Sequence, residues 1–215
     1  MARRHSGPEE KAVSYEEALA LHTQGGPMRP LVAVGGDVLT SLGPDLTDVP
    51  AFVIAGPPRT GRSTALLVAA ESLLAAGSGL VVLAPRRSPL RRLRGRPGVA
   101  ALITDADVTA DEFRQILGSV PEEYGVIVVD DAELFMGAEI DSDLARLARG
   151  GSGTGWGVLA VGNAESLAPN RTGWMGRVKR NRTGMLLSPQ PGRGLLHLGD
   201  GTPRPVRVPL LEAAL

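Results

Sequence analysis

The sequence has no cysteine, few aromatic residues and no long apolar run, and each absence excludes a class of function. Without cysteine, the chain has no disulfide, no thiolate metal site and no cysteine nucleophile. Its three histidines, His5, His22 and His197, are far apart in the sequence and lack the spacing of metal ligands. No apolar stretch approaches the roughly 20 residues of a membrane-spanning helix, and the start of the chain lacks the apolar core of a signal peptide. We therefore expect a soluble, cytoplasmic protein without a membrane span.

The chain also has no net charge. Lys and Arg together number 23, as do Asp and Glu, so the formal net charge is zero. Nothing in this balance attracts nucleic acid or an anionic membrane, and binding to either would need a local basic patch. The chain has 215 residues, 43% of them hydrophobic, which is enough to bury a globular core.

One segment, GPPRTGRST at Gly56–Thr64, almost matches the phosphate-binding loop pattern G-x-x-x-x-G-K-[ST]. Gly56 and Gly61 occupy the glycine positions and Ser63 the hydroxyl position, but Arg62 stands where the pattern has lysine. Backbone N–H groups of such a loop, with the positive end of the following helix, bind phosphate oxygens. The structural alternative is a tight strand-to-helix turn without a ligand. We predict that the loop binds a nucleotide through Gly56, Pro57, Pro58, Arg59, Thr60, Gly61, Arg62, Ser63 and Thr64.

The surrounding pattern is that of an α/β protein. The run Phe52–Ala55 is apolar at consecutive positions, which predicts a strand buried on both faces, and apolar residues at helical spacing follow the loop until Gly77. A capping box at Thr109–Glu112 predicts the start of another helix. Strands that alternate with helices imply crossover connections and a mainly parallel central sheet flanked by helices. Further strands are predicted at 31–34, 80–84, 101–103, 126–129, 158–161, 185–187 and 195–198, with a short segment at 38–46 and a helix at 140–149.

Polar residues follow two of these strands where a nucleotide site needs them. Asp130 comes after four apolar residues and is placed to hold Mg²⁺ together with the Ser63 hydroxyl. We assign catalytic roles to Asp131, which would face the attacking water, and to Asn163, which would sense the γ-phosphate. The alternative for the two aspartates is an N-cap pair on the following segment, which is compatible with the functional role.

Two substitutions argue against fast hydrolysis. Arg62 brings a planar, bulky guanidinium in place of the compact lysine ammonium, and this exchange is not conservative. Asp131 is one methylene shorter than the glutamate that an active ATPase usually has there. Both predict slow turnover or none.

The first 30 residues form a polar segment with one predicted helix, from about Glu9 to Leu21. The Gly25-Gly26-Pro27 break ends it. The segment is interpreted either as a docking helix or as a linker, and we favour the linker. We therefore place the folded domain at residues 31–215.

With these residues in hand, the chain resembles the FtsK/SpoIIIE family of P-loop ATPases, which have a RecA-like core. It is most similar to the degenerate C-terminal ATPase modules of EccC-like proteins of actinobacterial type VII secretion. The resemblance runs from about Leu31 to Val208, and its most specific stretch is AGPPRTGRSTALL. Further stretches with this similarity are VAVGGDVLTSLGPDL, VIVVDDAELF, GVLAVGNAESL, RTGMLLSP and LLHLGDG.

The resemblance implies a RecA-like P-loop NTPase fold and an ATP site with Mg²⁺, made by Gly56–Thr64, Asp130 and Asn163. It implies other ATPase modules of the same motor or ring as partners, and the helical export signal of a secreted protein as a substrate. Partner domains would hold such a module at the inner face of the cell membrane. The chain departs from the family in having few residues between Pro189 and Gly194 and only one ATPase module.

Two arginine-rich segments leave other functions open. The segment Arg86–Arg96 could contact DNA or the nucleotide of a neighbouring subunit, but we favour a solvated loop because the chain has no net charge and few aromatic residues to stack on bases. The segment Arg171–Arg182 is interpreted as an inter-subunit surface. A DNA translocase module and a regulatory pseudo-ATPase therefore remain alternatives to a secretion ATPase module.

Overall fold

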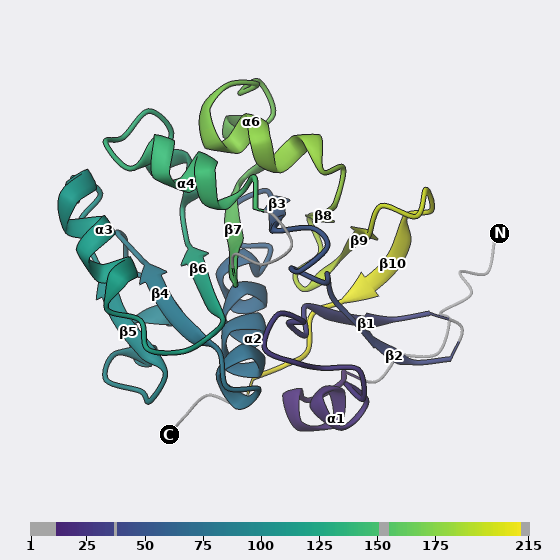
Figure 1. Ribbon diagram of the computed structural model, residues 1–215. Helices are drawn as coiled ribbons and strands as arrows, with labels where there is room; N and C mark the ends of the chain where they lie inside the picture. The colour runs from purple at the N-terminus through teal and green to yellow at the C-terminus, as the bar shows by residue number, and fades with distance from the viewer. Residues whose placement is uncertain (1–11, 37, 151–154, 212–215) are drawn as a thin grey trace, which may run out of the picture.

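The computed structural model describes residues 12–36, 38–150 and 155–211, which form one ten-stranded sheet with helices on both faces (Figure 1). The strand order is β2-β1-β10-β9-β8-β3-β7-β6-β4-β5. The strands are β1 (Ala33–Gly35), β2 (Thr40–Leu42), β3 (Ala51–Gly56), β4 (Gly79–Leu83), β5 (Val99–Ile103), β6 (Gly125–Val129), β7 (Trp156–Asn163), β8 (Gly184–Leu187), β9 (Arg193–His197) and β10 (Arg204–Arg207). The helices are α1 (Tyr15–Ala20), α2 (Arg62–Ala75), α3 (Ala110–Gly118), α4 (Asp141–Leu147), α5 (Ala164–Leu167) and α6 (Gly173–Arg180), with 3₁₀ turns η1 (Pro89–Leu93) and η2 (Ala132–Phe135).

The central strands are parallel, and the predicted α/β fold with a mainly parallel central sheet flanked by helices is confirmed. Six neighbouring strands pair in parallel, in the order β8, β3, β7, β6, β4 and β5. Every residue of β4 and β6 is buried, as expected for apolar runs covered on both faces. Because the strands are parallel, their carboxyl ends lie at one edge of the sheet, where the candidate site is.

The other end of the sheet is antiparallel. β9 pairs with β8 and β10, and β1 pairs with β10 and β2. Within the predicted segment 38–46, only Thr40–Leu42 is a strand. β10 was not predicted, because Pro205 and its flanking arginines disguise a strand that is nevertheless hydrogen-bonded on both sides.

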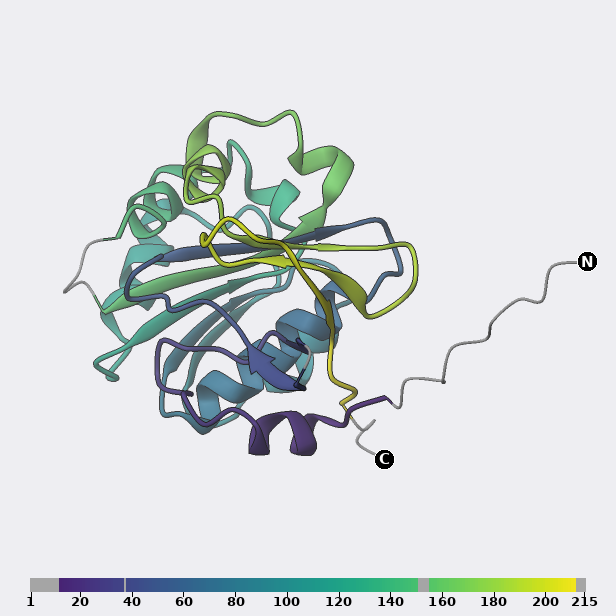
Figure 2. The same ribbon diagram turned by 90° about the vertical axis from the view of Figure 1, so that its right-hand side faces the viewer.

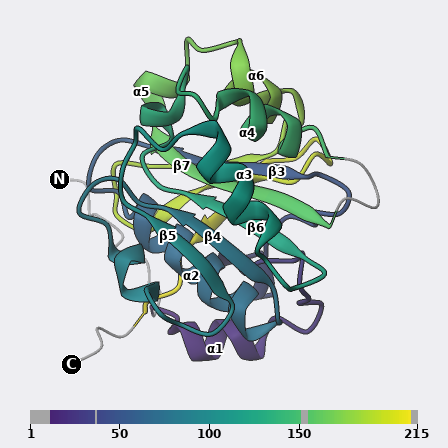
Figure 3. The ribbon, with the colours of Figure 1, turned by 60° about the vertical axis from the view of Figure 1, so that its left-hand side comes forward.

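Two apolar clusters cover the two faces of the sheet. Figures 2 and 3 show α1 and α2 on one side and α4, α5 and α6 on the other. On the first side, six consecutive residues of α2, from Ala65 to Ala70, are buried, so this part of the helix is covered all round, by the sheet and by α1 and the segment 28–34. On the second side, Phe113, Leu144 and Trp174 from α3, α4 and α6 share one cluster with β6 and β7. The helix α2, which follows the glycine loop, is therefore fixed along most of its length.

The described part of the first 30 residues packs on the same core. The predicted helix Glu9–Leu21 is shorter in the structure, Tyr15–Ala20, and begins with a capping box at Ser14; the residues before Ala12 lie outside the described residues. Ala18 is fully buried. The backbone N–H of Tyr15 donates to Leu210, 2.8 Å, so the beginning and the end of the described chain are hydrogen-bonded to each other. None of the helices in the described residues is both long and apolar enough for a membrane span.

Candidate nucleotide site

The glycine loop lies between β3 and α2, as the sequence predicts. Gly61 caps α2 with a φ of 92°, a left-handed conformation that favours glycine. A Cβ at Gly56 would lie 2.8 Å from Thr60 Oγ1 and 2.9 Å from Leu187 Cβ, so a side chain does not fit there. Buried Thr60 closes the loop, with its hydroxyl donating to the carbonyl of Pro57, 2.9 Å. The exposed residues of the loop are Pro58, Arg59 and Thr64.

Ser63 and Asp130 are far apart in sequence and meet in the structure. The Ser63 hydroxyl donates to Asp130 Oδ1, 3.0 Å, and the same oxygen accepts the backbone N–H of Asp131, 3.0 Å. The Asp130 side chain is buried at the end of β6. A hydroxyl and a carboxylate oxygen so close suit Mg²⁺, which takes few protein ligands and fills its other positions with water and phosphate oxygens. Within the described ranges, three or more acidic, histidine or cysteine side chains nowhere gather as a metal site.

Asp131 forms an ion pair with an arginine of the loop that follows β4, the strand next to β6 in the sheet. Its Oδ1 lies 3.6 Å from Arg86 Nη1, and its backbone is left-handed, with a φ of 48°. Burial raises the pKa of the Asp131 carboxyl, the charges of Asp130 and Glu133 add to this, and Arg86 and Arg62 oppose it. Asp131 is the N-cap residue of η2 but makes no side-chain capping hydrogen bond. Its carboxylate therefore faces charged groups of the site.

Asn163 lies beside the glycine loop, because it is in register with Gly56 across β3 and β7. Its side-chain oxygen accepts the N–H of Glu165, 2.9 Å, and so caps α5. Its backbone N–H donates to Glu133 Oε2, 3.2 Å. The side-chain oxygen of Asn163 is therefore engaged in the cap of α5. The sensing role of Asn163 stays a prediction.

Glu133 is a carboxylate of the site that the sequence reasoning missed. It lies in η2 and is half-buried. A Cβ added at Gly162 would lie 2.6 Å from Glu133 Oε2. The glycine leaves room for the carboxylate against the end of β7. The sequence carries no periodic signal for this contact, because Asp130 precedes η2 and the left-handed backbone of Asp131 lies between Asp130 and Glu133.

Arg62 is folded back on its own loop. Its Nη1 donates to the carbonyl oxygen of Gly56, 3.1 Å, across the turn where phosphate would bind. The guanidinium is half-buried and lies near enough to Asp131 to lower the pKa of that carboxyl. The site thus holds two guanidinium groups, from Arg62 and Arg86, beside its carboxylates.

Several other basic residues of the two arginine-rich segments, predicted as possible contacts for DNA or partners, already form ion pairs or hydrogen bonds within the chain. Arg92 and Arg96 form ion pairs with Glu71 on α2, at 3.4 Å and 3.2 Å, and Arg91 donates to the carbonyls of Ala84 and Pro85. In the second segment, Lys179 donates to three backbone carbonyls, those of Leu167, Ala168 and Asn170. Burial and the charge of Arg171 lower the pKa of Lys179.

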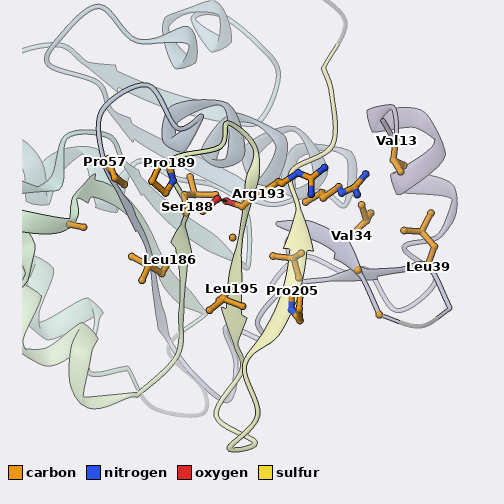
Figure 4. A pocket seen from close by; sticks show the side chains of 17 residues that line it. Val13, Val34, Leu39, Pro57, Leu186, Ser188, Pro189, Arg193, Leu195 and Pro205 are labelled. Atoms are coloured by element: carbon orange, nitrogen blue, oxygen red, sulfur yellow. Dashed lines mark hydrogen bonds between the residues drawn. The ribbon is translucent and has the colours of Figure 1, made fainter. Parts of the chain in front are cut away.

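A groove of about 890 Å³ adjoins the glycine loop (Figure 4). Its wall is an apolar row in which Leu186, Leu195 and Pro205 are cross-strand neighbours on β8, β9 and β10. Leu186 is 54% exposed and Leu195 48%, because their neighbours along each strand face the α2 side of the sheet. Pro57 of the glycine loop lines the same groove. Among the described residues that line it, none is acidic.

Several solved structures that are similar to this chain are ATPase domains. The cytoplasmic domain of the Thermomonospora curvata type VII secretion ATPase EccC matches 94% of this chain with a TM-score of 0.75 and 16% identity. ATPases 2 and 3 of the same protein, in complex with a signal sequence peptide, match 93% with a TM-score of 0.75 and 17% identity. A protein described as an ATPase matches 94% with a TM-score of 0.69 and 16% identity.

This chain spans 28% and 42% of the two EccC chains and 96% of the protein described as an ATPase. No protein-family model and no curated protein matches the sequence. At these identities the likeness shows the fold, which is that of the EccC ATPase domains.

Proposed function

We propose that this chain is a nucleotide-binding ATPase module of an FtsK/SpoIIIE-type motor, of the type VII secretion kind, with a degenerate site that hydrolyses ATP weakly or not at all. The observation that supports it best is the Arg62 guanidinium, which donates to Gly56 O beside the Ser63–Asp130 pair. In this proposal the loop and the Asp130 carboxylate hold Mg-ATP, whereas the cation that should reach between phosphates is held on the loop itself.

In this proposal the backbone amides at the start of α2 bind the phosphates, and Ser63 with Asp130 holds Mg²⁺. The bound metal would neutralise charge between phosphate oxygens. Asp131 is one methylene shorter than the glutamate that an active ATPase usually has there, which makes it a poor group for orienting water. Binding without fast turnover follows from the short Asp131 side chain and from the contact that holds Arg62 on the loop.

A titration with Mg-ATP tests the proposal. We expect the native protein to bind weakly and Arg62→Lys to bind about tenfold more tightly, equivalent to about 1.4 kcal/mol, because the ammonium can reach between phosphates. Calorimetry measures the affinity, and phosphate release measures turnover. Arg94→Lys, at an exposed arginine outside the loop, is the matched control and should change neither.

Two outcomes would contradict the proposal. No binding by the native protein at millimolar Mg-ATP removes the nucleotide-binding function and favours the regulatory pseudo-ATPase. Unchanged affinity and turnover in Arg62→Lys removes our explanation of the arginine.

We propose further that the groove binds the apolar face of a helical export signal or of a sister ATPase module. The exposed row of Leu186 and Leu195 supports this, since contiguous exposed apolar surface is typical of interaction sites. A similar ATPase was solved with a signal sequence peptide. A DNA translocase would instead show ATPase activity stimulated by duplex DNA and a DNA affinity that falls steeply with salt. The ion pairs of Arg92 and Arg96 with Glu71 make that alternative less favourable.

A further inference from the structure

We propose that Arg86 binds the terminal phosphate of a nucleoside triphosphate held in this chain's own glycine loop, and so distinguishes triphosphate from diphosphate. The inference rests on the proposed nucleotide-binding function and adds a residue from outside the loop. Arg86 would act within the same chain, rather than on a neighbour's nucleotide or on DNA.

The sheet brings Arg86 to the site. It follows β4 by three residues, and β4 pairs in parallel with β6, so both strands end at the same edge. The backbone N–H of Asp130 donates to Leu83 at the end of β4, 2.9 Å, which ties the two ends together. From there the Arg86 side chain reaches across to Asp131, with 3.6 Å between Nη1 and Oδ1. Asp131 is adjacent to Asp130, whose carboxylate accepts the Ser63 hydroxyl from α2.

The contact that Arg86 makes is easily exchanged. Its side chain is 58% exposed, and an ion pair of this kind contributes about 0–1 kcal/mol. A phosphate offers the guanidinium two charge-assisted hydrogen bonds in a fitting planar geometry, which is a stronger interaction. A triphosphate in the loop can therefore draw the Arg86 guanidinium away from Asp131.

The charges of the site make a second cation necessary. The carboxylates of Asp130, Asp131 and Glu133 lie together at the carboxyl ends of β6 and β7, and each repels an incoming polyphosphate. Arg62 is hydrogen-bonded to Gly56 O, which holds its guanidinium on the loop. Arg86 is paired with Asp131, so it lies on the side of the carboxylates, where the last phosphate would lie beyond Ser63.

The rest of the arginine-rich segment does not compete for this role. Arg91 donates to the backbone of its own loop, and Arg92 and Arg96 pair with Glu71 on the flank of α2. Arg87 is adjacent to Arg86 and exposed, and within the described ranges no contact of Arg87 with the site is recorded. Arg87 is therefore the matched control for removal of one positive charge.

The test is a fluorescence titration of the full chain with the N-methylanthraniloyl derivatives of ATP and ADP in Mg²⁺. Arg86→Ala should weaken binding of the triphosphate about tenfold, as loss of a charge-assisted hydrogen bond predicts, and binding of the diphosphate less than twofold. Arg87→Ala should leave both affinities within twofold of the native protein. Arg86→Lys should recover part of the lost triphosphate affinity. Thermal unfolding checks that each variant is folded.

Each other result contradicts the inference. Equal losses for both nucleotides, or equal losses in Arg86→Ala and Arg87→Ala, would mean a general charge effect. Tighter binding by Arg86→Ala would mean that Arg86 obstructs the site. If the native protein and Arg86→Ala bind the triphosphate equally well, this inference alone is rejected. If the native protein binds neither nucleotide, the proposed function is rejected as well.

Discussion

Arg59, within the glycine loop, has a left-handed backbone with a φ of 66°, and its side chain is exposed. A non-glycine residue in this conformation costs roughly 1–2 kcal/mol. Arg59→Gly should therefore raise the free energy of unfolding by about 0.5–1 kcal/mol, the remainder being lost to the greater backbone entropy of glycine in the unfolded chain. Urea denaturation measures this change.

Arg87→Gly separates strain from the general effect of glycine. Arg87 is an exposed loop arginine that is not among the residues with positive φ. The same substitution there should lower stability by about 0.5–1 kcal/mol, because only the entropic cost applies. If Arg59→Gly lowers stability to a similar extent, the loop is not strained at Arg59.

Single residues of the site differ in how far the sequence predicts them. The proximity of Ser63 and Asp130 could be predicted, because the glycine loop before Ser63 follows β3, Asp130 follows β6, and the carboxyl ends of these parallel strands lie at one edge of the sheet. The contact of Arg86 with Asp131 could not, since periodicity carries no information on where a loop side chain points. Glu133 was missed for the same reason. The catalytic roles of Asp131 and Asn163 stay predictions.

At the scale of elements, Asp45 holds the segment between β2 and β3 through several contacts. It accepts the backbone N–H of Thr47, 3.0 Å, and Nε of Arg29, 2.7 Å. Burial alone would raise the pKa of the Asp45 carboxyl, but the hydrogen bonds from Thr47 and Arg29 outweigh it and lower the pKa. These bonds therefore stabilise the folded protein when the carboxyl is ionised.

The sign of the pH dependence follows from this lowered pKa. The contribution of Asp45 is fully present above its ordinary pKa of 3.8 and is lost as the pH falls through its lower pKa in the folded protein. Asp45→Asn should cost about 1 kcal/mol at pH 7 and progressively less relative to the native protein below pH about 4. Urea denaturation between pH 3 and pH 7 measures the difference, with Asp48→Asn, an exposed carboxylate, as the control. A constant difference at all pH values would contradict this.

Whole elements were predictable where burial is uniform. β3, β4, β6 and β7 are apolar at consecutive positions because helices cover both faces, and the sequence shows this directly. β10 was hidden by its proline, and the helix at the start of the chain was predicted longer than it is. Both elements depend on tertiary partners, which composition does not reveal.

At the scale of the whole molecule, the groove and the phosphate loop are parts of one surface. Pro57 belongs to both, and the backbone N–H of Gly192, in the turn between β8 and β9, donates to Thr60 O, 3.0 Å. A partner in the groove would therefore touch the strands that support the loop. The wall of the groove is an apolar row, so a helix with an apolar face suits it.

Leu195→Glu tests the groove as a docking surface. A fluorescein-labelled helical peptide, with leucine at i, i+3, i+4 and i+7 and glutamate on its other face, serves as the probe. The native protein should bind it, and Leu195→Glu should bind at least about tenfold more weakly, because a carboxylate in the apolar row is desolvated and repels the acidic flanks. Val38→Glu, at a residue that is 79% exposed and does not line the groove, is the control and should bind like the native protein. Fluorescence anisotropy measures the affinity of the peptide. If Leu195→Glu binds the peptide as tightly as the native protein, the groove is not the peptide site. If both variants lose affinity equally, only the overall charge of the protein matters.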